Sequence, residues 1–185
     1  MIWKFFVSVI VLTLALSALS CEKDDNRVNP RNDHEDEIPV KAPYFKLKSL
    51  EGDSMSLDDT ENKVVVLFFF GHSCAPCRTA AVSIETRLRK PYEGRDDYAL
   101  LGMEASNGNT AAVSSFRSLT GVTFPLLMNA SHQANAYETT IDRLIIVNRS
   151  GYIHHKSNLA AGCDLDDVAE KIGMMLADQN MEICD

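Results

Sequence analysis

Basic residues are scarce in this chain of 185 residues. It has 18 Lys and Arg residues against 26 Asp and Glu residues, which gives a formal net charge of −8. No basic patch occurs along the sequence, so the electrostatic footprint of a nucleic-acid-binding protein is missing. We therefore expect no nucleic-acid partner.

An apolar run long enough to cross a membrane is missing as well. The apolar stretch from Phe5 to Leu19 follows Lys4 and ends too early for a membrane-spanning helix. A basic start followed by a short apolar centre is typical of a signal peptide, which we assign to residues 1–20. An ordinary secretory signal and an uncleaved anchor are the alternatives to the lipoprotein signal described next.

Cys21 follows directly after Ala18-Leu-Ser20, which resembles the processing site of bacterial lipoproteins. The resemblance implies that Cys21 carries the lipid and holds the protein on a membrane. Residues 21–41 are polar and contain few apolar side chains, so we expect a disordered tether. Its first residues, Glu22–Asp25, resemble tags that some Bacteroidetes-type lipoproteins use for surface display. The predicted location is the cell envelope, facing the periplasm or the outer surface.

A second pair of Cys or His residues at zinc-ligand spacing is also absent, and this matters for Cys74 and Cys77. The pair follows the unbroken apolar run Val64–Phe70, which predicts a strand buried on both faces. Because a helix is expected to begin at the pair, its dipole and free N–H groups favour a thiolate there. We expect Cys74 to be the exposed attacker and Cys77 the shielded resolver. Pro76 fits the first helical turn without losing a needed hydrogen bond.

Hydrophobic spacing predicts the remaining elements. Apolar residues continue from Cys77 at helical intervals and end before Lys90-Pro91. Further predicted elements are a hairpin over 44–57, a strand over 98–104, a helix after 107–109 containing Val113, Phe116 and Leu119, a hairpin over 143–156, and a last helix with Leu165, Val168, Ala169, Ile172 and Leu176 on one face. This order predicts an α/β sheet covered by helices on both faces.

Residues 69–78, Phe-Phe-Gly-His-Ser-Cys-Ala-Pro-Cys-Arg, resemble the active site of the thioredoxin superfamily, in particular the TlpA/ResA-like envelope oxidoreductases. The resemblance extends over about residues 42–177. It implies a thioredoxin-like domain over 42–185, with a central mixed β-sheet flanked by helices and an N-terminal β-hairpin. It also implies a thiol–disulfide oxidoreductase that acts on protein clients and needs no cofactor or metal. Most of the family reduces its clients with electrons from a membrane donor, whereas an outward-facing protein would act as an oxidant, an isomerase or a peroxide-linked protein.

Several residues around the motif depart from the family pattern. Ser73 replaces an aromatic residue, Phe68 replaces the buried acid of thioredoxins, and Ala80 replaces the glutamate that TlpA-like proteins carry in the first helix. Asp142 falls where the family has a cis-proline. Because a non-proline cis bond costs about 2.5–4 kcal/mol, we expect a trans bond before Asp142. Its carboxylate would raise the pKa of Cys74 and accept a proton from Cys77, or else it points to solvent.

Three further residues are candidates near the site. A protonated His72 would favour the Cys74 thiolate, although His72 is equally consistent with a solvent-facing turn. Cys163 would approach Cys74 if the final loop follows the family, as a third thiol or as a small core residue. About 20 Å of helix would separate Cys163 from Cys184, so we expect both thiols free, or Cys184 paired between molecules.

Two other functions fit the same residues. The first is a soft-metal carrier that binds copper through Cys74 and Cys77, helped by His72 or Met103. The second is a structural relative without redox activity.

Overall fold

Two apolar strands lie at the centre of the sheet. In the computed structural model, which describes residues 39–177, β3 (Val64–Phe70) is buried at every position and pairs in parallel with β4 (Tyr98–Glu104). Both strands have the predicted bounds. A strand covered on both faces has no solvent-facing side, so its sequence is a continuous apolar run instead of an alternating one.

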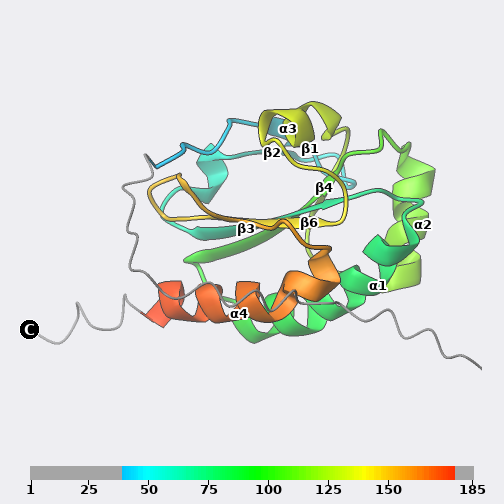
Figure 1. The fold of residues 1–185 in the computed structure, drawn as a ribbon. Coiled ribbons are helices and arrows are strands. Elements are labelled where there is room, and N and C mark those ends of the chain that lie inside the picture. Colours follow the sequence, from blue (N-terminus) through cyan, green and yellow to red (C-terminus); the bar gives the residue numbers. More distant parts are fainter. Residues whose placement is uncertain (1–38, 178–185) are drawn as a thin grey trace, which may run out of the picture. The chain divides into compact units, whose positions relative to one another are not determined.

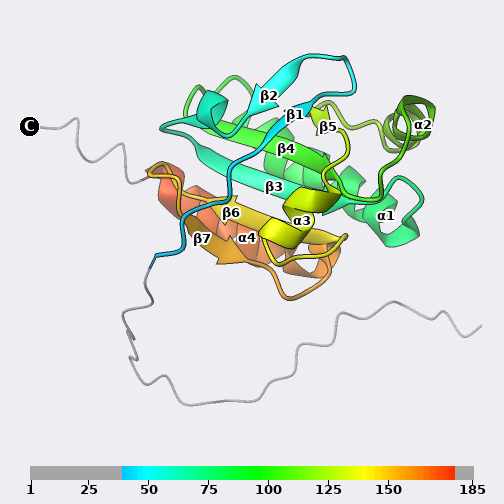
Figure 2. The ribbon, with the colours of Figure 1, turned by 90° about the horizontal axis from the view of Figure 1, so that it is seen from above.

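Five strands form the main sheet, in the order β5-β4-β3-β6-β7 (Figure 2). β5 (Leu126–Leu127) is parallel to β4, whereas β6 (Arg143–Val147) is antiparallel to both β3 and β7 (Ile153–Lys156). The predicted central mixed sheet and the hairpin over 143–156 are therefore confirmed.

Helices and a separate hairpin cover the two faces of this sheet (Figure 1). On one face lie α1 (Ala75–Ile84) and α4 (Ala161–Ala177), with α2 (Thr110–Thr120) beside α1; on the other lie α3 (Ser131–Ala136) and the hairpin of β1 (Lys46–Lys48) and β2 (Ser54–Ser56). The predicted N-terminal β-hairpin is confirmed.

Alternate residues of β3 supply both halves of the core. Val66, Phe68 and Phe70 belong to the cluster under α1 and α4, while Leu67 and Phe69 belong to the cluster on the opposite face. This division follows from the two-residue period of a strand. Each fully buried side chain of this size stabilises the fold by about 1.5–3 kcal/mol.

The helix that begins at the cysteine pair changes from α-helical to π-helical geometry before it ends. Its predicted apolar stripe is buried, but the α-helix passes into a π turn over Glu85–Arg89. At this widening the buried carboxylate of Glu85 accepts hydrogen bonds from the backbone N (2.9 Å) and the Oγ1 (2.7 Å) of Thr123. Glu85 therefore ties the helix to the segment before β5.

Two helices differ in detail from the prediction. Leu119 of α2, expected in the core, is 69% exposed, and Thr120 is buried instead. The helix is capped as expected, by Asn109, whose Oδ1 accepts from the backbone N of Ala112 at 2.9 Å. α4 begins at Ala161, before the acidic residues predicted to mark its start.

The chain enters the fold along β7. The backbone N of Ile153 donates to the O of Val40 (2.8 Å), Lys41 forms a β-bridge with Tyr152, and the N of Ala42 donates to the O of Gly151 (2.9 Å). Val40 and Lys41, assigned to the tether, are therefore paired, because β7 is an edge strand with free backbone groups. The predicted signal peptide, Cys21 and the tether up to residue 38 lie outside the described residues.

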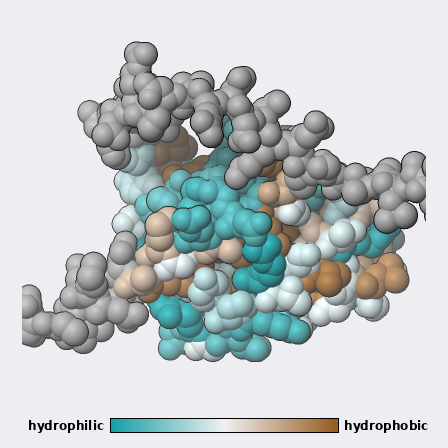
Figure 3. All heavy atoms as spheres, turned by 60° about the horizontal axis from the view of Figure 1, so that its bottom comes forward, coloured by the Kyte–Doolittle hydropathy of each residue, from teal (hydrophilic) through white to brown (hydrophobic). Residues whose placement is uncertain are grey.

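The surface over α1 and α4 is mainly hydrophilic, with small hydrophobic patches (Figure 3). Exposed apolar side chains on these helices include Val82 and Met174. Single exposed apolar residues are normal for a protein surface. Within residues 39–177, no helix has the length and apolar character needed to cross a membrane.

Candidate active site

The two motif cysteines lie where β3 passes into α1. The backbone N of Cys74 donates to the O of Gly71 (3.0 Å), which closes the turn after the strand. Cys74 is the N-cap of α1, and its Sγ accepts a hydrogen bond from the N of Cys77 at 3.1 Å. Pro76 occupies the first helical turn, where an N–H would have no helical partner. This local geometry matches the one predicted from the spacing.

Cys74 and Cys77 form a disulfide, with their Cα atoms 5.2 Å apart. Their surroundings are unequal: Cys74 is partly exposed, whereas Cys77 is completely buried. An incoming group can therefore reach only the first sulfur. The order of exposure is the predicted one.

Apolar residues surround the inner sulfur. Phe68 and Ala80, two of the departures from the family pattern named above, lie with Cys77 in one hydrophobic cluster. Low polarity around a thiol disfavours its ionised form. Neither residue offers a proton acceptor to Cys77.

Asp142 lies directly before β6, at the edge of the sheet where the cysteines sit. Its backbone N donates to the O of Phe69 (2.7 Å) and its O accepts from the N of Ala161 (3.0 Å). No peptide bond within residues 39–177 is cis, as expected, and the φ of Asp142 is 62°, in the left-handed region. The neighbouring Ile141 reaches the turn: a Cβ placed on Gly71 would lie 3.5 Å from its Cδ1 and 3.6 Å from the Cβ of Cys74.

The side chain of Asp142 does not point to solvent, because the residue is only 8% exposed. Its Oδ1 is buried without a hydrogen-bond partner. This burial raises the pKa of Asp142, although the nearby guanidinium of Arg143 acts in the opposite direction. The alternative of a solvent-facing carboxylate is therefore wrong.

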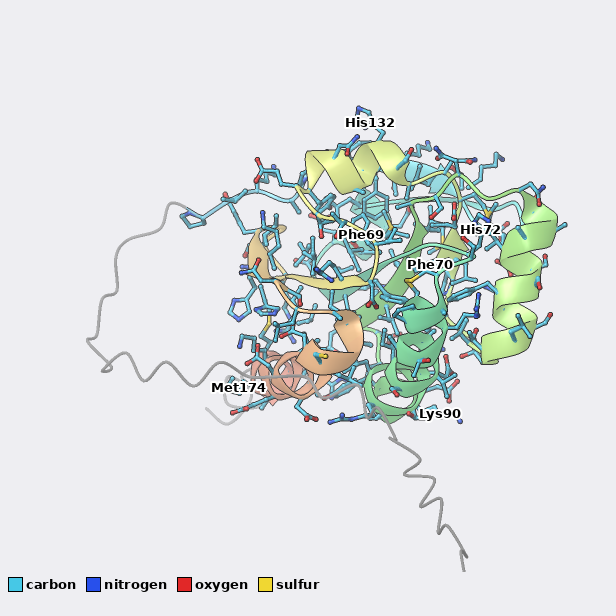
Figure 4. All side chains as sticks on the ribbon, turned by 45° about the vertical axis from the view of Figure 1, so that its right-hand side comes forward. Phe69, Phe70, His72, Lys90, His132 and Met174 are labelled. Atoms are coloured by element: carbon cyan, nitrogen blue, oxygen red, sulfur yellow. A yellow bond between two sulfur atoms is a disulfide. The ribbon has the colours of Figure 1, made fainter. Side chains whose placement is uncertain are left out.

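His72 is held by an acid that the sequence did not suggest as its partner. The His72 Nδ1 lies 3.0 Å from the Oε1 of Glu104, which is fully buried at the end of β4. The same oxygen accepts from the N of Ser106 (3.1 Å), and Oε2 accepts from the N of Gly108 (2.8 Å). Figure 4 shows His72 just beyond Phe70 at the end of β3. In the sequence, the indication of this partner was the position of Glu104, an acidic residue at the end of an otherwise apolar strand.

Met103 and Cys163 do not join the pair in the expected way. Met103 is fully buried in the cluster on the opposite face of the sheet, away from the cluster that holds Cys77. Cys163 lies in the first turn of α4, but its sulfur is engaged in a disulfide, so the expectation of a free thiol is wrong. Cys184 lies outside the described residues.

A cluster of possible metal ligands occurs in the described part of the chain, and it does not include the cysteine pair. The group of three or more His, Cys, Asp or Glu donors found among residues 39–177 consists of His155, Asp164 and Asp167. Their ligand atoms lie within 4.8 Å of one another, at the start of α4. This group contains neither motif cysteine.

Known proteins share this architecture. Residues 38–158 match the sequence profile of the AhpC/TSA family. The thioredoxin-like protein YneN of Bacillus subtilis is 31% identical over 105 residues, which cover 54% of this chain and 61% of YneN. The match thus spans less than two thirds of that relative.

Solved structures agree with the sequence comparison. A proposed protein disulfide isomerase from Bacteroides thetaiotaomicron has a TM-score of 0.69 and 25% identity, covering 78% of this chain and 93% of its own. StoA from Bacillus subtilis has a TM-score of 0.55 and 20% identity, covering 71% and 98%. The profile match covers more than half of the chain and the fold is thioredoxin-like, so the chain belongs to the AhpC/TSA family.

Proposed function

We propose that this protein is a thiol–disulfide oxidoreductase that exchanges disulfides with protein clients through Cys74 and Cys77. The observation that carries the proposal is the disulfide at the start of α1, with one sulfur partly exposed and the other buried. Family membership and the likeness to oxidoreductases support it.

The exchange proceeds in two displacements. In the reduced protein the Cys74 thiolate attacks a client disulfide, forms a mixed disulfide, and releases one client thiolate. The Cys77 thiolate then attacks the Sγ of Cys74 and releases the second client thiolate. Two electrons pass to the client, which leaves as a dithiol, while the protein keeps the Cys74–Cys77 disulfide. A dithiol donor restores the reduced pair by the reverse route.

The test is insulin reduction with dithiothreitol as the donor. We expect the wild type to catalyse it, and Cys74→Ser to abolish both catalysis and covalent trapping of a client. Cys77→Ser should lose turnover but retain trapped client, because attack survives and resolution does not. Ser83→Ala, on a later turn of α1, is the control. Absence of catalysis by the wild type would favour the redox-inactive alternative.

A lipid on Cys21 places this activity in the cell envelope, where protein clients and a membrane electron donor are available. The proposal rests on the signal-like residues 1–20 that precede Cys21. Cys21→Ala should move the protein from the detergent phase to the aqueous phase of a detergent partition, because the acyl chains supply the membrane affinity. Unchanged partition would contradict lipidation.

Asp142 takes the place of the acids missing near Cys77. It is the buried carboxylate of the loop that lies against the Gly71–Cys74 turn, and its Oδ1 has no partner. We assign it as the acceptor of the Cys77 proton during resolution. A negative charge there also opposes the Cys74 thiolate, so Asp142→Asn should lower the midpoint pH of Cys74 alkylation. An identical pH profile in the two proteins would mean that the carboxylate does not act on the site.

A further inference from the structure

Glu104 is an unusual residue to find at full burial. A buried carboxylate is costly unless its charge is compensated. Here compensation comes from four N–H groups. Two are backbone groups in the loop after β4, and two belong to His72, one in its ring and one, at 3.5 Å, in its backbone. Every close partner of this carboxylate is thus either in its own loop or in the turn that carries Cys74.

The loop after β4 and the turn before Cys74 are packed without spare room. A Cβ on Gly71 would come within 2.4 Å of the Ser106 Oγ, and a Cβ on Gly108 within 2.5 Å of the His72 Nδ1. The backbone N of Ala105 also donates to the O of Phe70 at 2.9 Å. Glycine at both positions permits this close approach, which brings the imidazole to the carboxylate.

His72 connects Glu104 to the reactive cysteine: its ring is hydrogen-bonded to Glu104, and its backbone leads through Ser73 to Cys74. It lies two residues before Cys74, so the two Cα atoms are at most about 7 Å apart. The bond between the Cys74 N and the Gly71 O makes this segment a closed turn. Any shift of His72 therefore moves the residue that caps α1.

We propose that Glu104 is a positioning residue for the thiol–disulfide reaction, acting through His72 to hold Cys74 at the start of α1. The inference rests on the proposed function, since positioning has meaning only if Cys74 attacks. With the turn held, the Cys74 sulfur stays where the N–H of Cys77 points at it. If the turn is loosened, the Cys74 thiolate loses the hydrogen bond from the Cys77 N–H and moves away from the stabilising N-terminus of α1.

The contact also sets the tautomer of His72. A carboxylate can only accept hydrogen bonds, so Nδ1 must carry the proton. Nε2 is then the nitrogen that lacks a proton when the ring is neutral. This assignment is a spectroscopic prediction: nitrogen–proton correlation spectra should show the Nδ1–H form of neutral His72 in the wild type.

The decisive variant is Glu104→Gln, which keeps the shape but places an amide NH₂ against N–H donors. We expect the alkylation rate of reduced Cys74 at pH 7 to fall about tenfold, the scale of a lost hydrogen bond to a charged group. A purely Coulombic role predicts the opposite, because removing a negative charge favours the thiolate. The alkylation rate in His72→Gln should fall by a similar factor. The rate in the double variant should be no lower than that of the slower single variant.

Glu85→Gln is the matched control. Glu85 is also a buried hydrogen-bond acceptor, but both of its donors belong to Thr123 and not to the cysteine turn. It should lower the melting temperature without slowing Cys74 alkylation or changing the His72 tautomer. An equal or faster alkylation rate in Glu104→Gln overturns the proposal, as does an Nε2–H tautomer in the wild type.

Two features keep the test clear. If Glu104→Gln does not fold, His72→Gln decides by the same rate, since His72 is partly exposed. Alkylation reports on Cys74 whether or not insulin is reduced. Failure of positioning is therefore distinguishable from failure of the proposed function.

Discussion

Replacing Asp142 by Asn should stabilise the protein at neutral pH. The Oδ1 of Asp142 is buried without a partner, and burial raises the pKa of this carboxyl. A buried polar atom left unsatisfied costs about 1–3 kcal/mol. Asn removes the charge but keeps a polar group, so we expect it to recover about 1 kcal/mol of this cost. Asn also tolerates the left-handed backbone at this position, where φ is 62°.

The sign of the pH dependence follows from the direction of the shift. A carboxyl whose pKa is raised by folding contributes its stability below the ordinary value of 3.8, and that contribution is lost as the pH rises through the folded pKa. The advantage of Asp142→Asn should therefore be largest near pH 7 and vanish near pH 3.

Thermal unfolding monitored by circular dichroism between pH 3 and pH 7 is the assay. A gain of about 1 kcal/mol corresponds to about 4 °C in a domain of this size. Asp96→Asn, an equal charge change at an exposed acid, is the control and should not reproduce the gain. A loss of stability at pH 7, or a gain that is the same at pH 3, would refute the reasoning.

Three other predictions concern stability. The pKa of Asp97 is lowered to about 2, mainly by a side-chain hydrogen bond from Arg95. The stabilising contribution of Asp97 is therefore fully present above pH 3.8 and is lost as the pH falls through about 2. Asp97→Asn should cost about 1 kcal/mol at pH 7 by urea denaturation, allowing for its partial exposure, and an equal cost at pH 2 would contradict this. Asn109→Ala removes the cap of α2 and should cost about 1 kcal/mol in the same assay; an unchanged denaturation midpoint would show that the cap contributes nothing. Gly102→Ala would place a Cβ 2.6 Å from the Leu126 Cδ2, with aromatic rings also close, so we expect a loss of about 1–3 kcal/mol, and full wild-type stability would mean that the core yields freely.

Elements with a strong periodic pattern could be predicted from the sequence. β3 and β4 have the expected bounds. The unbroken apolar run of β3 is typical of a strand at the centre of a sheet that is covered on both faces. The cysteine pair at the start of α1 followed from the spacing alone. Leu119 was misplaced, because helical periodicity near the last turn leaves several positions equally close to the core.

Contacts between distant segments could not be predicted in this way. Glu104 and His72 are 32 residues apart, and only the register of β3 against β4, which pairs Phe70 with Glu104, brings them together. Likewise, Glu85 at the start of the π turn accepts hydrogen bonds from Thr123, which is 38 residues away. Such pairs depend on strand register and loop path, and no local pattern encodes these.

The route by which the chain joins β7 has a mechanical consequence. Val40, Lys41 and Ala42 pair with residues 151–153, whereas Cys74 follows the opposite end of β3, since Val65 pairs with Val147 and Phe69 with Arg143. A pull on the N-terminal side of the domain would therefore load the β6–β7 hairpin first. The hydrogen bonds between residues 40–42 and 151–153 would break first. β3, which leads to the redox pair, would be stretched only after these bonds had broken.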